Sequence, residues 1–304
     1  MTMIENANSM KLSVIIVSYN TASHTLKLLA ALKSHPVHEV IVIDNASIDE
    51  TTSFIQKLHP DVNLIQNPQN RGFGAANNQG LDHMTGDLAL LLNSDCFPEP
   101  NAIASLVQAF QDPNVIAAGG QLLNPDGTHQ QSACNNLTLW AVLCEQLLLE
   151  KLFPNSSFFN PYWISRKIID RSLDPAPVSQ VMGACLMLRP IERFDERFFL
   201  YCEDTELCRR VQTHGQILYI PESKFVHALG ASSTQNRWWS IAMYNRGKEL
   251  YFQIHHSPIH QTLCFIINRA GALLRLVIKP RQAKQWLQVL VTPFGGPTLP
   301  TDAQ

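Results

Sequence analysis

The sequence lacks the features that define several broad classes of protein. Its seven cysteines are odd in number and contain no Cys-x-x-Cys pair, which disfavours a disulfide framework and a zinc site. Lysine and arginine total 23 against 25 for aspartate and glutamate, so the charge gives no reason to expect nucleic acid as a partner. No stretch holds the ~20 uninterrupted apolar residues of a membrane-spanning helix. Residues 1–10 have no basic segment followed by an apolar run, so we expect no secretory signal and a cytoplasmic protein.

The rest of the composition is that of an ordinary globular protein, with 45% hydrophobic residues in a chain of 304. That length suits one large domain or a domain with an appendage. Apolar runs of strand length alternate with helical patterns along the first part of the chain. We expect strands near 12–19, 40–43, 62–65, 87–95 and 115–123, with helices near 25–32, after 47, and at 73–84 and 102–110. This alternation predicts an α/β fold with a mainly parallel sheet flanked by helices.

Three of the expected strands end in polar residues. Ser18-Tyr19, Asp44-Asn45 and Asn93-Ser94-Asp95 follow apolar runs, and the carboxyl ends of parallel strands meet at the edge where open sheets bind ligands. We therefore expect these residues to line one crevice. Two alternatives stay open, because Asn-Ser-Asp is also common in turns and Asp44-Asn45 can simply precede a helix. The pattern Ser47-Ile48-Asp49-Glu50 predicts a capping box that begins that helix.

No glycine-rich phosphate loop follows the first strand, where the chain has Ser18-Tyr19-Asn20-Thr21. The phosphates of a bound nucleotide would need to be neutralised in another way. A divalent cation on Asp95 is a candidate, since hard cations bind carboxylate and diphosphate oxygens together. The glycines of Asn70-Arg71-Gly72-Phe73-Gly74 allow a ligand to approach the backbone at a helix start, where Arg71 can meet a phosphate or a base edge.

The alternation breaks after Gln121. We expect an apolar helix at 140–153, a Pro/Ser/Asn-rich connection at 155–177, a strand at 180–189, a helix at 203–214, a strand at 217–220, and His227 in the following loop. Glu206 and Arg210 are spaced to pair on one helix face.

The end of the chain is basic. No acidic residue lies between Glu249 and Asp302, whereas five cations lie among apolar residues there: Arg269, Arg275, Lys279, Arg281 and Lys284. The polar positions of 261–279 fall roughly on one face of a helix and leave a wide apolar face. Such a helix can pack on the domain or a second subunit with its arginines in solvent, or it can attach to a membrane surface through 261–292.

Seven short motifs occur together in order: Val17-Ser18-Tyr19-Asn20, Ile43-Asp44-Asn45-Ala46-Ser47, Asn70-Arg71-Gly72-Phe73, Leu92-Asn93-Ser94-Asp95, Gly183-Ala184, Glu203-Asp204 and His227. This set resembles the inverting family 2 glycosyltransferases of the GT-A fold, in particular the bacterial rhamnosyltransferase-like branch, over about residues 11–246. The resemblance implies a GT-A domain over 1–250, with a nucleotide-binding half at 11–123 and an acceptor-binding half at 124–250. Residues 251–304 would form a basic helical extension.

The resemblance also implies roles for individual residues. Ser18, Tyr19 and Asp44 would hold the base and ribose of the donor, and Arg71 and Gly72 would close over it. Asn93 stands at the first position of the family's Asp-x-Asp motif, in the donor site. Asp95 at its last position would bind Mg²⁺ or Mn²⁺ with His227. Gly183 and Ala184 would lie on the acceptor side, and Asp204 in the Glu203-Asp204 dyad would be the catalytic base.

Each role has a plainer alternative. Asp204 can cap the helix that follows it, and Glu203 can be the base instead. A lone loop histidine such as His227 is commonly exposed to solvent, and Trp238-Trp239 can be packing anchors instead of a grip on sugar or lipid.

The expected activity is metal-dependent, inverting transfer of a sugar to a hydroxyl of a cell-surface glycan or lipid-linked acceptor, at the inner face of the membrane. The donor would be dTDP-rhamnose, with a UDP-hexose as the alternative. A nucleotidyltransferase and a non-catalytic nucleotide-sugar-binding scaffold are the rival functions, and a homo-oligomer stays open.

Overall fold

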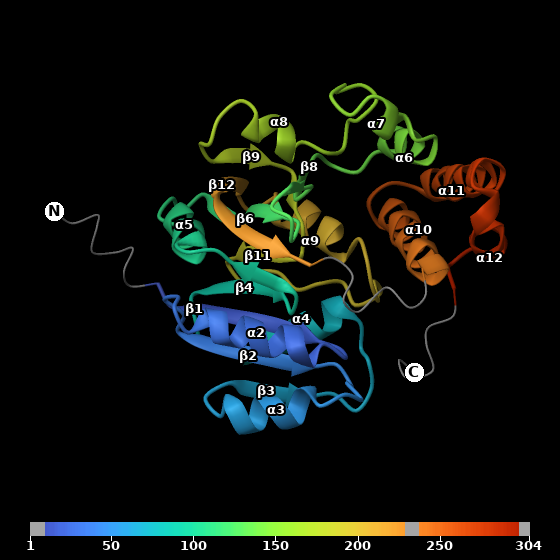
Figure 1. Ribbon diagram of the computed structural model, residues 1–304. Coiled ribbons are helices and arrows are strands. Elements are labelled where there is room, and N and C mark those ends of the chain that lie inside the picture. The colour runs from blue at the N-terminus through green and yellow to red at the C-terminus, as the bar shows by residue number, and fades with distance from the viewer. Residues whose placement is uncertain (1–9, 229–236, 298–304) are drawn as a thin grey trace.

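The computed structural model describes residues 10–228 and 237–297, so the expectation about a leader at residues 1–9 lies outside the described residues. The first half alternates strands and helices as the sequence predicts (Figure 1). In chain order its elements are β1 (Leu12–Ser18), α2 (Ala22–Leu32), β2 (Glu39–Asp44), α3 (Thr51–Leu58), β3 (Asn63–Gln66), α4 (Phe73–His83), β4 (Leu88–Asn93), β5 (Cys96–Pro98), α5 (Ala102–Ala109) and β6 (Val115–Leu123).

These strands belong to one mixed sheet with the strand order β3-β2-β1-β4-β11-β6-β12-β5. The neighbours β3, β2, β1 and β4 are parallel, whereas β11 runs antiparallel to β4 and β6. The predicted α/β architecture is therefore confirmed. Because β1, β2 and β4 are parallel, their polar carboxyl ends lie at the same edge of the sheet.

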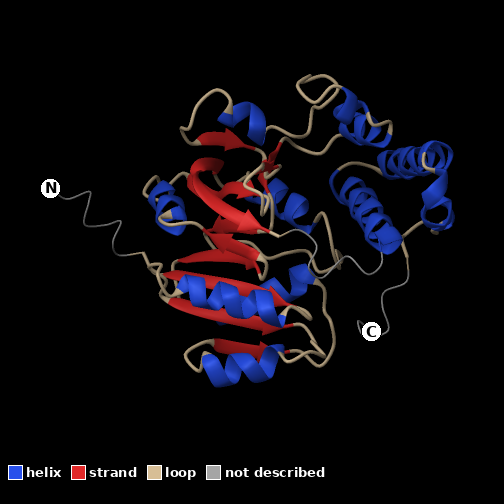
Figure 2. Cartoon of the chain, viewed as in Figure 1, coloured by secondary structure: helices blue, strands red, loops and turns tan. Residues whose placement is uncertain are grey.

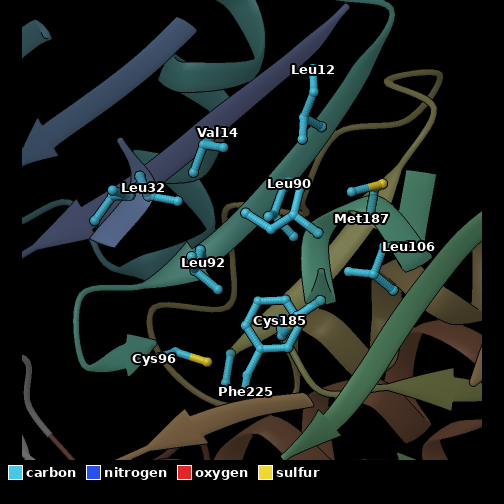
Figure 3. Close-up of a cluster of buried hydrophobic side chains, with 14 of the residues drawn as sticks. Leu12, Val14, Leu32, Leu90, Leu92, Cys96, Leu106, Cys185, Met187 and Phe225 are labelled. Atoms are coloured by element: carbon cyan, nitrogen blue, oxygen red, sulfur yellow. The ribbon is translucent and has the colours of Figure 1, made fainter. Parts of the chain in front are cut away.

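Helices cover both faces of the sheet (Figure 2). In β1, Val14 and Ile16 belong to the core cluster under α2, whereas Ile15 belongs to the cluster under α4 and α9. Successive strand side chains point to opposite faces, so a strand that is covered on both sides must be apolar throughout. Figure 3 shows Leu90 and Leu92 of β4 packed with Cys185 and Phe225 in the first of these clusters.

The second half is less regular. Its elements are β7 (His129–Gln130), β8 (Ala133–Cys134), α6 (Leu139–Gln146), α7 (Leu149–Leu152), α8 (Ser165–Ile169), β9 (Ala176–Val178), β10 (Gln180–Val181), β11 (Cys185–Leu188), α9 (Glu203–Val211) and β12 (Gln216–His227).

Several local predictions are corrected here. The helix expected at 140–153 is interrupted at Leu148, whose φ of 62° lies in the left-handed region. The strand expected at 180–189 is divided at residues 182–184, and the one expected at 217–220 extends to His227. The helix after β2 begins at Thr51, because Asp49 Oδ1 accepts hydrogen bonds from the Thr51 amide and hydroxyl; the predicted capping box at 47–50 does not form.

Three helices end the described chain: α10 (Arg237–His255), α11 (Pro258–Ile278) and α12 (Ala283–Val291), with a short 3-10 turn at Pro280–Gln282 before the last one. They pack together at the side of the molecule, where α11 also packs against α6 (Figure 1). The predicted helical extension is confirmed, and α10 runs through residue 250, where the extension was expected to begin. Although no uninterrupted apolar run is present, α11 is long and apolar enough to span a membrane by length and composition.

Candidate active site

At the end of β1, the Ser18 side chain bonds within the protein. Ser18 at the end of β1 is fully buried, and its hydroxyl lies 2.9 Å from each of the hydroxyls of Thr21 and Thr25 at the start of α2. Its side chain therefore fixes the turn after β1, and the expected donor contact of Ser18-Tyr19 stays a prediction.

Asp44 at the end of β2 has an unused acceptor. Its Oδ2 accepts a hydrogen bond of 3.1 Å from the Ser47 amide, whereas Oδ1 is buried and has no hydrogen-bond partner. Burial raises the pKa of this carboxyl above its usual value. A buried acceptor without a donor costs free energy unless a ligand supplies one, so Asp44 marks a place where an N–H or O–H group of a ligand belongs.

Asn45, which was expected to line the crevice but was given no role of its own, holds the loop before α4. Its Oδ1 accepts a hydrogen bond from the Arg71 amide at 3.0 Å, and its Nδ2 donates to Asn70 Oδ1 at 2.8 Å. The sequence signal was present in the Asp44-Asn45 pair, but the partner lies more than twenty residues away. The guanidinium of Arg71 points to the surface and lies 3.5 Å from Glu196.

Gly72 joins this loop to the other half of the site. Its φ is 83°, and a Cβ at this position would lie 2.3 Å from the carbonyl oxygen of Phe199. The next amide, that of Phe73, donates to the same carbonyl at 2.9 Å. Only glycine allows this close approach, so residue 72 is fixed as glycine by packing against Phe199, and its predicted contact with the donor stays a prediction. Trp239 lies edge-on to the Phe199 ring, with centroids 6.2 Å apart, as a packing residue would.

The end of β4 brings Asp95 to His227. The antiparallel register of β12 and β5 places His227 opposite Cys96, and its Nε2 lies 3.3 Å from Asp95 Oδ1. Asn93 Nδ2 lies 3.4 Å from the same ring nitrogen. Both members of the pair are buried, so His227 is not the exposed loop residue of the plainer interpretation. It ends a strand.

Gln130 of β7 fixes the orientation of this imidazole. Its Oε1 lies 2.7 Å from His227 Nδ1, and its Nε2 donates to Asn124 Oδ1 at 2.9 Å. Because the amide oxygen faces the ring, Nδ1 carries a proton, and in the neutral imidazole the lone pair is on Nε2, the nitrogen turned toward Asp95. Gln130 was not predicted as a site residue, since nothing local distinguishes it from the neighbouring glutamines.

A carboxylate and an oriented imidazole lone pair fit a divalent cation. Metal-bound histidines usually donate their other N–H to an oxygen, as His227 does to Gln130. Among the described residues, no group of three His, Cys, Asp or Glu side chains is placed to hold a metal. The described part of the chain therefore offers two ligands here, and oxygens from a ligand such as a diphosphate could complete the coordination of a cation.

The Glu203-Asp204 dyad begins α9 and is buried. Asp204 Oδ2 accepts the Gly183 amide at 2.8 Å, and its Oδ1 accepts the Thr205 amide at 2.8 Å. Glu203 Oε2 is buried without a hydrogen-bond partner. Burial raises the pKa of both carboxyls, and the charge of Asp204 raises that of Glu203 further. The helix cap is Cys202 and not Asp204, so the capping interpretation of Asp204 does not hold.

The chain before the dyad is tightly constrained. Tyr201 and Cys202 both have left-handed backbones, with φ of 69° and 66°. Gly247 of α10 faces this segment, and a Cβ at Gly247 would lie 2.6 Å from the Tyr201 carbonyl oxygen. Strained backbone of this kind persists only where the surrounding structure holds it, and it commonly occurs at functional sites.

Gly183 and Ala184 connect the two carboxylate centres. The Gly183 amide holds Asp204, while the Ala184 carbonyl accepts the Asn93 amide at 3.1 Å. This dipeptide, predicted to contact the acceptor, thus ties the dyad to the end of β4. Hydrogen bonds to the backbone of this dipeptide therefore fix the position of the dyad relative to the Asp95–His227 pair.

The fold is shared with solved glycosyltransferases. The structure titled GalNAc-T7 with UDP, GalNAc and Mn²⁺ matches with a TM-score of 0.57 and 16% identity, covering 91% of this chain and 54% of that one. The mannosyltransferase PcManGT from Pyrobaculum calidifontis, in complex with GDP-Man and Mn²⁺, matches with a TM-score of 0.54 and 15% identity, covering 93% and 86% of the two chains. The fold is therefore that of the GT-A glycosyltransferases.

Residues 13–173, more than half of the chain, match the family described as glycosyl transferase family 2, and the protein belongs to this family of enzymes. It is 27% identical over 280 residues to the N-acetylglucosaminyl-diphospho-decaprenol L-rhamnosyltransferase of Mycobacterium tuberculosis, with 83% of this chain and 89% of that protein covered. This similarity places it in the rhamnosyltransferase-like branch and confirms the resemblance found in the sequence.

Proposed function

We propose that this enzyme transfers rhamnose, with inversion, from dTDP-rhamnose to a hydroxyl of a glycan or lipid-linked acceptor, and that the transfer requires a divalent cation. The observation that carries the proposal is the pairing of two buried carboxylate centres through Gly183 and Ala184. The Asp95–His227 pair is suited to bind a cation together with the diphosphate of the donor. The Glu203-Asp204 dyad is suited to accept a proton.

Asp204 has the properties of a general base. Two backbone amides orient its carboxylate, and its raised pKa brings its proton affinity closer to that of a base working near neutral pH. In the transfer, the acceptor oxygen forms a bond to the anomeric carbon as the bond from that carbon to the diphosphate oxygen breaks. The proton of the acceptor hydroxyl passes to Asp204, and attack from the side opposite the diphosphate inverts the configuration.

Asp95 and His227 would hold the cation, which supplies charge stabilisation for the departing diphosphate. Gln130 keeps the His227 lone pair in place, and Asn93 lies beside the same nitrogen. Mg²⁺ and Mn²⁺ both accept carboxylate oxygen, and imidazole favours the transition metal. The two solved GT-A structures that contain Mn²⁺ support a metal-dependent reaction.

The unpartnered Oδ1 of Asp44 supports a pyrimidine nucleotide in the donor. Thymine and uracil both present an imide N–H, which the buried, unpartnered Oδ1 of Asp44 could accept. This contact does not distinguish the two bases. The rhamnosyl specificity rests on the mycobacterial relative, and transfer from a UDP-hexose is the second candidate, favoured by the UDP named in the GalNAc-T7 structure.

Titration calorimetry with dTDP and UDP, each with and without Mn²⁺, tests the donor site. We expect Mn²⁺-dependent binding in the wild type and its loss in Asp95→Ala, whereas Asp61→Ala, which removes an exposed carboxylate far from the site, should bind normally. The tighter nucleotide identifies the donor base. Failure of both nucleotides to bind under any condition would refute the donor site, and binding without transfer to any acceptor would favour the scaffold alternative.

A further inference from the structure

The polarity of α11 is the reverse of what its sequence pattern suggested. Its polar residues face the protein, where Asn268 is fully buried and donates to Glu249 Oε1 at 2.9 Å. Arg275 is also buried and donates to the Gln146 carbonyl at 2.7 Å and the Glu145 carbonyl at 3.0 Å. The arginine that was expected in solvent therefore binds α6. This corrects the interpretation of a packed helix with solvated arginines.

The outward face of α11 is apolar instead. Its exposed positions recur every three or four residues over five turns, at Ile259, Leu263, Ile266, Ala270, Leu273 and Val277. We call these six residues the outer stripe. Only 22% of the most apolar 18-residue stretch of α11 is buried, whereas the core helix of a soluble protein is mostly buried. A continuous exposed apolar surface of this kind marks an interaction site.

The next helix extends this surface. Leu287 and Val291 of α12 are exposed, as is Phe294 just beyond it. The ring of Phe294 lies 5.1 Å from that of Phe265, and Arg269 of α11 donates to the Thr292 carbonyl, so the end of α12 lies beside the middle of α11. The helices α11 and α12 therefore form a hairpin, and both carry exposed apolar side chains.

Exposed cations accompany the hairpin. Lys279, Arg281 and Lys284 lie in and next to the turn between its helices and are exposed. No acidic residue occurs from 250 to 301, so nothing on this segment neutralises them. A second copy of the same surface would bring three more cations and no acid to pair with them. An apolar stripe bordered only by positive charge is complementary to a lipid surface with anionic headgroups.

We propose that the outer stripe of α11 and the exposed residues of α12 lie in the interface of a bilayer that contains anionic lipid, with Lys279, Arg281 and Lys284 against its headgroups. The helix lies along the surface and does not cross the bilayer, because crossing would remove Asn268 and Arg275 from the partners that satisfy them. This surface is separate from the donor site, and its function does not depend on which nucleotide sugar is used.

Vesicle flotation tests the proposal with the full-length protein and phosphatidylcholine vesicles, with and without phosphatidylglycerol. We expect binding to the anionic vesicles, and a loss of affinity of about tenfold or more in Ile266→Glu/Leu273→Glu, which places charge in the apolar contact. The matched control is Leu58→Glu/Ile191→Glu. Those residues are 52% and 50% exposed, against 55% and 53% for Ile266 and Leu273, but lie outside the hairpin.

A second variant, Lys279→Gln/Arg281→Gln/Lys284→Gln, isolates the charge. Each cation removed should weaken binding to anionic vesicles roughly fivefold and reduce its dependence on salt. Nucleotide binding by calorimetry should be unchanged in every variant, which separates a failure of this proposal from a failure of the donor site.

Four results would overturn the proposal. The first is a wild type that ignores anionic vesicles, and the second is an Ile266→Glu/Leu273→Glu variant that binds them as well as the control variant does. The third is resistance of the bound protein to extraction with alkaline carbonate, which would indicate a spanning helix. A wild-type dimer that becomes monomeric in Ile266→Glu/Leu273→Glu, without vesicle binding, would assign the surface to a second copy instead.

Discussion

Asp95 and Asp204 are both buried carboxylates near the end of an apolar segment, but their neighbours give them opposite electrostatics. Asp95 faces an oriented imidazole, whose lone pair adds a second donor atom for a cation. Asp204 lies next to another carboxyl, Glu203, and burial raises the pKa of each. The first arrangement favours binding of positive charge, and the second favours binding of a proton. The residue type alone therefore does not decide the role of an aspartate; its partner does.

The largest effect should come from removing the base. We expect Asp204→Asn to lower kcat by about 10²- to 10⁴-fold, because an amide cannot accept the acceptor proton, while the affinity for nucleotide with Mn²⁺ stays unchanged. Steady-state kinetics and calorimetry on the same preparation measure the two. The control Asp61→Asn changes an exposed carboxylate. A variant Asp204→Asn with normal kcat would transfer the role of base to Glu203.

A smaller effect should follow at the other centre when the imidazole loses its support. Replacing Gln130 by Leu removes the acceptor for His227 Nδ1–H, so we expect Mn²⁺-dependent nucleotide affinity to fall about 10- to 100-fold. Calorimetric titration of Mn²⁺ into the protein–nucleotide mixture measures it. The conservative variant Gln130→Glu keeps an acceptor oxygen and should restore the affinity. Equal losses in Gln130→Leu and Gln130→Glu would show that packing matters and orientation does not.

The smallest expected effect is a pH-dependent change in thermal stability that comes from Glu203 of the dyad. Burial and the charge of Asp204 raise the pKa of Glu203 in the folded protein above its value in the unfolded chain. The protonated carboxyl therefore contributes to the stability of the fold at low pH. This contribution is lost as the pH rises through the pKa of Glu203 in the folded protein. Glu203→Gln has no proton to lose. We expect its Tm to exceed that of the wild type in neutral and alkaline buffer, by about 2–4 °C per kcal/mol gained.

Thermal unfolding of the wild type and Glu203→Gln across a pH series measures this difference. The gain should shrink as the pH falls toward the ordinary range of a glutamate. A Tm difference that does not change with pH would mean that the charge of Glu203 is not the cause.

The sequence was most informative where structure is local. Apolar runs with polar ends identified β1, β2 and β4, and their common parallel direction brought Asp44 and Asp95 to one sheet edge as predicted. The Glu206–Arg210 pair on α9 also forms as the i,i+4 spacing predicted. In each case the strand or helix itself could be recognised from a few neighbouring residues.

The sequence was least informative where a role depends on a distant partner. Gln130 matters because β7 brings it to His227, a contact between residues 97 positions apart. The pattern of α11 correctly gave a two-faced helix, but periodicity does not say which face meets the protein. That was decided by Glu145, Gln146 and Glu249, which satisfy the polar face. Predicting the exposed face would have required knowledge of α6 and α10 as its neighbours.

The missing side chain of Gly247 has a geometric consequence for the acceptor. It lets α10 lie directly against the backbone of Tyr201, two residues before the dyad, while α10 also packs on α11. If the outer stripe lies in a bilayer as proposed, this contact would hold the Glu203-Asp204 dyad at a fixed height above the lipid. For the proposed lipid-linked acceptor, the number of sugar units between the lipid anchor and the reacting hydroxyl would then have to match this height.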